Sequence, residues 1–357
     1  MTPVELSRTV LHAVRRAVDA GELSVAVPAR VAVAPPGPGG RGDYATNVAL
    51  QLARPAGQPP LLVAEVLRPY LARAEGVTDV EITGPGFLNI SLDRSAAVSA
   101  LVRRILRDGP RYGHTDTLAG RIFPLRVPYE VRAEVLADAL TRIVASQGGR
   151  VEIEHQSPQD GNSGNSSSHN DGNRGGFWLR PLAAPEDPTP LGPDAARWAL
   201  LHPAPHDRPR VSADHLVQRE SNPLFRVRYA HARTRAVSRN AADLGFTAAE
   251  SGPATCHGDA ARSLLPLLAD HPRVLATVTV TATTSADTVL DPSAPSRLTR
   301  HLLAVADATL PLLLTVLPQG EEKPSAAHRA RLALADAAGT VLAGGLSLLG
   351  IDAPDHL

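Results

Sequence analysis

Apolar residues recur through the first hundred positions at the spacing of amphipathic helices, interrupted by short apolar runs typical of strands. The predicted helices span residues 3–20, 43–53, 60–75 and 94–108. Asp43 is the candidate cap of the second helix. Residues 80–83 and 87–92 flank a Gly-Pro-Gly turn and predict a hairpin. This order predicts a small α+β domain, an antiparallel sheet covered by helices on one side.

The pattern changes after residue 120. A strand at 121–127, a helix at 129–147 and a strand at 151–155 predict one βαβ unit with parallel strands. Residues 156–176 contain no large apolar residue and are dense in Gly, Ser and Asn, which is typical of a flexible linker.

Beyond the linker, the hydrophobic pattern is mainly helical. The predicted helices span residues 194–202, 213–220, 222–244, 258–268, 295–316 and 325–349. Alternating Val and Thr over Val274–Thr284 favour a strand there, although the surrounding region is helical. The C-terminal part is therefore predicted to be a helical bundle.

Length, charge and cysteine content narrow the class of protein. The chain has 357 residues, enough for two or three domains, and its 36 basic residues balance 36 acidic ones, so a polyanion site must be a local patch. Cys256 is the only cysteine, so an intrachain disulfide is excluded and a reducing cytoplasm is favoured. No apolar run approaches the ~20 residues of a membrane span. We expect a cytoplasmic protein without a membrane partner.

The strongest candidate for such a patch is the predicted helix that starts at Asn222, a plausible N-cap followed by Pro223 at the first helical position. No carboxylate lies between Glu220 and Asp243. A helix with this composition suits phosphates and stacked bases, or it is a solvated basic face. Its arginines are Arg226, Arg228, Arg233, Arg235 and Arg239.

Histidine spacing does not predict a metal site. His202 and His206 are four residues apart, but Pro203 and Pro205 break the helix that a two-histidine site needs. His169 has no partner at ligand spacing.

Three stretches together resemble the arginyl-tRNA synthetase family. Residues 42–50, with the turn and strand at 84–90, are similar to the N-terminal additional domain of the bacterial enzymes. Residues 192–201 and 222–233 resemble the entry to the helical anticodon-binding (DALR-type) domain, and residues 348–357 resemble the family's C-terminus.

The resemblance divides the chain into five predicted segments. It implies an α+β N-terminal additional domain, a Rossmann-like remnant of the catalytic domain, a Gly/Asn/Ser linker, a connecting segment and an all-α anticodon-binding domain. These segments span residues 1–110, 118–155, 156–176, 177–211 and 212–357, respectively.

The resemblance also implies which residues meet tRNA, with tRNA(Arg) as the expected partner. Phe87 and Asn89 would contact the D-loop by stacking and by hydrogen bonding, unless Phe87 is a buried strand residue. Tyr229, His231 and Arg233 fall in the family's anticodon signature, and packing inside the bundle is the alternative for Tyr229 and His231. Arg226 and Arg228 complete the predicted anticodon contacts, since both lie on the same helix.

The family's catalytic signatures are absent. The family binds ATP at a strand-to-helix turn with a His-x-Gly-His pattern, where this chain has Leu125-Arg-Val-Pro-Tyr-Glu130 without histidine. The family's lysine loop is excluded, since the only lysine is Lys323, near the C-terminus. A single βαβ unit is also too small for a doubly wound nucleotide fold. We therefore predict no catalytic residues and no cofactor; ATP is expected only if the chain is a ligase.

Three functions follow from these observations. The first is a non-catalytic synthetase-like protein that binds tRNA through the anticodon and the D-loop. The second is a reduced or split arginine–tRNA ligase that needs a partner for catalysis. The third is a module derived from a synthetase that binds another protein.

Overall fold

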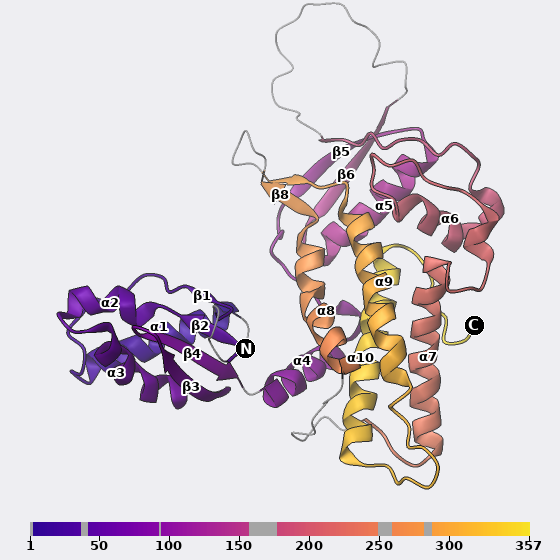
Figure 1. The fold of residues 1–357 in the computed structure, drawn as a ribbon. Helices are drawn as coiled ribbons and strands as arrows, with labels where there is room; N and C mark the ends of the chain where they lie inside the picture. Colours follow the sequence, from indigo (N-terminus) through magenta and orange to yellow (C-terminus); the bar gives the residue numbers. More distant parts are fainter. Residues whose placement is uncertain (1–2, 37–41, 93, 157–176, 249–258, 282–287) are drawn as a thin grey trace, which may run out of the picture. The chain divides into compact units, whose positions relative to one another are not determined.

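The computed structural model describes residues 3–36, 42–92, 94–156, 177–248, 259–281 and 288–357 (Figure 1). It has two compact units, Met1–Ala100 and Leu101–Leu357. The predicted linker at 156–176 lies almost entirely outside the described residues. None of the helices in the described ranges combines the length and hydropathy of a bilayer-spanning helix.

The first unit is the predicted antiparallel sheet with helices packed against it. The helices are α1 (Pro3–Asp19), α2 (Val48–Ala56) and α3 (Pro60–Ala72). The strands are β1 (Val33–Ala34), β2 (Tyr44–Thr46), β3 (Val77–Thr83) and β4 (Phe87–Leu92), in the order β1-β2-β4-β3. Leu6 and Val10 of α1, Leu67 of α3 and Leu88 and Ile90 of β4 are fully buried in one shared core. The α+β prediction is confirmed.

The start of α2 differs from the prediction. Tyr44–Thr46 pairs with β4, and the helix begins after Asn47. Asp43 caps no helix there; its Oδ2 accepts a hydrogen bond from the Leu92 N–H at 2.9 Å, which ties the entry of β2 to the end of β4. A carboxylate before an apolar run is therefore used for sheet closure here, because a short strand intervenes.

The second unit contains the predicted βαβ segment. β5 (Ile122–Pro128) and β6 (Arg150–Gln156) are parallel, and α5 (Val131–Ser146) connects them. A short third strand, β7 (Phe177–Trp178), pairs with β5 in parallel, so the sheet order is β6-β5-β7. Alternate β5 residues, Phe123, Leu125 and Val127, are buried.

Helices form the rest of the second unit. They are α6 (Gly192–Leu201), α7 (Pro223–Asp243), α8 (Asp259–Ala276), α9 (Ala294–Leu313) and α10 (Ala326–Leu348), while α4 (Arg94–Asp108) crosses the boundary between the units. α7, α9 and α10 pack on one another, as Figure 1 shows. A side chain at Gly339 of α10 would collide with Thr234 of α7, so glycine permits this close approach.

One prediction in this region was wrong, and another holds for part of its range. The helix expected at 213–220 is a short 3-10 turn, Ala213–Leu216. The Val/Thr-rich stretch at 274–284 contains both a helix and a strand, since α8 continues to Ala276 and β8 (Thr279–Thr281) is the predicted strand. Residues 282–284 lie outside the described residues. β8 pairs with β9 (Thr288–Leu290) in an antiparallel hairpin. The sequence analysis did not predict β9 or this hairpin in the helical C-terminal part.

Candidate nucleic-acid interface

Helix α7 starts where the sequence predicted. Asn222 is its N-cap, and its Oδ1 accepts hydrogen bonds from the N–H groups of Leu224 (3.1 Å) and Phe225 (3.4 Å). Its Nδ2 donates to the carbonyls of His215 (2.8 Å) and Val217 (2.9 Å). A single buried amide thereby fixes both the first turn of α7 and the segment that leads into it.

The apolar stripe of α7 faces the bundle. Leu224, Val227, Ala230, Thr234 and Val237 recur at helical spacing and are buried. The rotation of α7 is thus fixed, and so is the side of the helix on which each arginine lies.

Two of the arginines form ion pairs with carboxylates from distant parts of the chain. Arg226 Nη2 contacts Asp307 Oδ1 of α9, and Arg228 Nη1 lies 3.3 Å from Asp194 Oδ2 of α6. Both arginine side chains are largely covered. These guanidinium groups therefore stabilise the bundle, and an RNA phosphate would have to compete with a carboxylate for either of them.

Tyr229 and Arg233 are different, because both are exposed. The Tyr229 ring is stacked on Phe225, with 5.4 Å between ring centroids and an angle of 22° between planes. Arg233 lies one turn further along, and the described residues provide no ion-pair partner for it. An aromatic ring and a guanidinium one turn apart suit a stacked base and a phosphate.

His231 points into the protein. It is 4% exposed, and its Nδ1 lies 3.0 Å from the carbonyl oxygen of Pro354. Burial lowers the pKa of the imidazole, although this carbonyl contact raises it in part. His231 therefore has a packing role here, and contact with RNA would require Pro354 to move.

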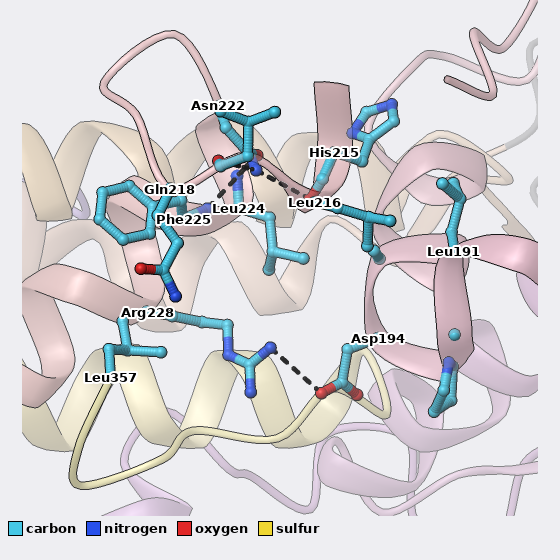
Figure 2. A pocket seen from close by; sticks show the side chains of 14 residues that line it. Leu191, Asp194, His215, Leu216, Gln218, Asn222, Leu224, Phe225, Arg228 and Leu357 are labelled. Atoms are coloured by element: carbon cyan, nitrogen blue, oxygen red, sulfur yellow. Dashed lines mark hydrogen bonds and ion pairs between the residues drawn. The ribbon is translucent and has the colours of Figure 1, made fainter. Parts of the chain in front are cut away.

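A cavity of about 260 Å³ lies beside the first turns of α7 (Figure 2). The Arg228–Asp194 ion pair crosses it, and Phe225, Gln218 and Leu357 contribute further side chains. The Nε of Arg228 is buried and has no hydrogen-bond partner among the described residues. The cavity thus combines an aromatic ring with an unsatisfied donor and a carboxylate.

The two predicted D-loop residues have different environments. Phe87, at the start of β4, is 41% exposed, so its ring is available for stacking. Asn89 is 2% exposed, and its Nδ2 donates to Thr83 Oγ1 at 2.7 Å. Contact of Asn89 with a base would require this internal bond to break.

The first turn of α5 follows the β5 strand, where the sequence has Glu130 in place of a histidine signature. Glu130 Oε1 accepts from the Arg132 N–H at 3.0 Å and Oε2 accepts from the Ala133 N–H at 2.9 Å. Free N–H groups at a helix N-terminus attract anions. Here, a carboxylate of the protein already occupies them.

Arg132 is a structural residue that the sequence did not point out. It is fully buried, and its guanidinium donates to backbone carbonyls only. These carbonyls belong to Leu182, Leu200, Pro203, Ala204, Pro205 and Asp207. One side chain of α5 thereby holds the connecting segment 182–207. The sequence did contain one signal for this role: an arginine lies among the apolar residues of the predicted helix 129–147.

The described residues contain no cluster of three or more His, Cys, Asp or Glu side chains that could hold an ion. His202 lies against Trp198, with 5.4 Å between ring centroids, and its Nδ1 is 3.3 Å from Thr299 Oγ1.

Comparison with known proteins associates both halves of the chain with one family. The model of the arginyl tRNA synthetase N terminal domain matches residues 5–92, and that of the DALR anticodon binding domain matches residues 227–357. The arginine–tRNA ligase of Renibacterium salmoninarum is 38% identical over 229 residues, which are 59% of this chain and 40% of that relative. The ligase of Kineococcus radiotolerans is 40% identical over 168 residues, 43% of this chain and 30% of the relative. The aligned part of the chain therefore covers less than half the length of these relatives.

Solved structures agree on the fold. The arginyl-tRNA synthetase of Thermus thermophilus has a TM-score of 0.54 at 15% identity, over 100% of both chains. The Plasmodium falciparum enzyme has a TM-score of 0.54 at 8% identity, over 99% of both chains.

Proposed function

Because the chain belongs to the arginyl-tRNA synthetase family, we propose that it binds tRNA, in particular tRNA(Arg), and does not aminoacylate it. The helical unit takes the anticodon loop, and the N-terminal unit takes the D-loop. Both matched domain models, one named for anticodon binding, support this proposal.

Within the proposed anticodon site, the residues divide into two groups. Tyr229 and Arg233 are exposed and make direct contact with RNA by stacking and by charge. Arg226 and Arg228 position α7 through their ion pairs, and His231 positions it through Pro354. In the first unit, the exposed ring of Phe87 stacks on a base, while Asn89 supports the turn that carries it.

The proposal that the chain does not aminoacylate tRNA rests on the N-terminal cap of α5. The family's ATP-binding signature belongs to this strand-to-helix turn, and the N–H groups that would meet phosphate donate instead to the Glu130 carboxylate. An incoming phosphate would meet a like charge. The chain also has only one lysine, Lys323, and it lies near the C-terminus.

Two assays test the proposal. An electrophoretic shift with total tRNA at low salt should detect a complex, and its absence would refute tRNA binding. Arginine-dependent ATP–pyrophosphate exchange should stay at background for the chain alone. Exchange that appears only with cell extract would instead support a split ligase that needs a partner.

A protein-binding role is the second candidate. Parallel sheets are normally covered on both faces. Here, Ile122 and Trp178 of the three-stranded sheet are exposed, as are Ile153 of β6 and Tyr129 just after β5. If the electrophoretic shift with tRNA fails, this surface is the next one to test.

A further inference from the structure

Residues Asp352–Leu357, here called the strap, run along α7 after α10 has ended (Figure 1). Gly350 begins this path with a φ of 70°, and a side chain there would collide with the guanidinium groups of Arg142 and Arg197. Ile351 is 3% exposed, and its N–H donates to the Leu346 carbonyl at 2.9 Å. The strap therefore leaves α10 in a fixed direction.

Three α7 residues at intervals of four contact the strap. His231 Nδ1 lies 3.0 Å from the Pro354 carbonyl oxygen, and Arg235 Nε lies 3.3 Å from Asp355 Oδ1. Arg239 Nη2 donates to the Asp355 carbonyl at 3.4 Å. Residues spaced by four share one face of a helix, so the strap covers a continuous stripe of α7.

The Asp355 carboxylate of the strap is more exposed than the Asp194 carboxylate that pairs with Arg228, and it belongs to no helix. Asp194 and Asp307 belong to helices of the bundle, and the Arg228–Asp194 pair is mostly covered. The side chains of Arg235 and Asp355 are 50% and 54% exposed. An ion pair this exposed adds little to the stability of the fold. It can thus be exchanged for a phosphate without disturbing the bundle.

We propose that the strap is an electrostatic brake on RNA binding. The Asp355 carboxylate occupies the Arg235 guanidinium, beside Arg239, as a substitute for an RNA phosphate. RNA that reaches this stripe displaces the carboxylate from Arg235 and gains one phosphate contact. The proposal rests on tRNA being the ligand of α7.

The test compares two variants of the full chain that lose the same charge. Asp355→Asn removes the carboxylate that faces Arg235. Asp352→Asn removes an exposed carboxylate of the same strap, for which the described residues show no arginine partner. Fluorescence anisotropy with tRNA at several salt concentrations should show Asp355→Asn binding about threefold tighter than Asp352→Asn, because one paired arginine is released.

A second pair of variants links the gain to Arg235. Arg235→Gln should bind more weakly than the wild type, because it removes the guanidinium that the RNA phosphate contacts once Asp355 is displaced. Adding Arg235→Gln to Asp355→Asn should abolish the threefold gain. Equal Kd values for Asp355→Asn and Asp352→Asn would overturn the brake and leave the proposed function standing. No binding by any of the proteins, with unchanged thermal unfolding, would overturn both.

Discussion

Helices α5 and α7 both begin at a side chain that accepts two backbone N–H groups, and they differ in the charge of that side chain. At α5 the acceptor is the Glu130 carboxylate, so the position suited to a phosphate is filled by an anion. At α7 it is the neutral amide of Asn222, and the following turns present Tyr229 and Arg233 to solvent. The same capping device closes an anion site in one helix and leaves a cationic surface open in the other.

The first turn of α5 also carries Arg132, which holds the connecting segment 182–207 in place, and its loss should have the largest effect. Arg132→Ala removes the donors from six backbone carbonyls and opens a cavity. We expect a loss of about 3–5 kcal/mol in the free energy of unfolding, measured with urea. Arg150→Ala, an exposed arginine on β6, is the matched control. A loss below 1 kcal/mol for Arg132→Ala would show that the joint is not needed.

Acid should weaken the bundle that supports α7 while the arginine surface keeps its charge. Burial lowers the pKa of His271 to about 3 and that of His301 to about 4, and their rings are stacked with 5.4 Å between centroids. Both pKa values lie below the ordinary value of about 6.5, so the unfolded chain binds protons first as the pH falls.

Stability is therefore fully present above about pH 6.5 and is lost as the pH falls toward 4. Each ring contributes a loss on the order of 2 kcal/mol, so we expect a decrease of about 4 kcal/mol between pH 7 and pH 5, read from urea unfolding at each pH. His271→Leu should reduce this dependence. A stability that does not change with pH in this window would contradict the buried neutral state of both rings.

A smaller effect on tRNA affinity should show whether binding depends on the exposed surface of α7 or only on the net charge of the protein. Arg233→Glu should raise the Kd for tRNA about tenfold and reduce the magnitude of the salt slope by about one. Arg219→Glu makes the same charge change just before α7, at an exposed arginine, and should have a weaker effect. Equal weakening by the two variants would indicate that net charge, and not the α7 surface, governs binding.

The smallest expected effect concerns the charge of the α5 cap. Glu130→Gln keeps one acceptor oxygen but removes the negative charge next to the helix N-terminus. We expect a loss of about 0.5–1 kcal/mol in urea unfolding at pH 7. Glu152→Gln, on the exposed edge strand β6, is the control and should change little. A stabilised Glu130→Gln would mean that the carboxylate is not a favourable cap.

Local patterns in the sequence predicted the elements of this comparison. Helical spacing placed α5 and α7 close to their observed bounds, and the residue type of Asn222 identified the α7 cap. These features depend on neighbours within a few residues. The α2 start was missed because Asp43 has its partner at Leu92, far along the chain.

The ion pairs of α7 could not be predicted in the same way. The absence of acidic residues between Glu220 and Asp243 suggested a free basic helix, but Asp194, Asp307 and Asp355 reach it through tertiary packing. Likewise, the burial of Asn89 depends on its bond to Thr83 across the hairpin. The sequence therefore overstated the cationic surface of α7. Among the described arginines of α7, only Arg233 and Arg239 are exposed and have no ion-pair partner.

The most direct test is a titration of the full chain with transcribed tRNA(Arg), beside the same transcript with a changed anticodon, at increasing salt. Binding should weaken as salt rises, and the changed anticodon should bind more weakly at every salt concentration. Equal affinity for the two transcripts would contradict anticodon recognition by α7. No binding to either transcript at low salt would contradict the proposed function itself.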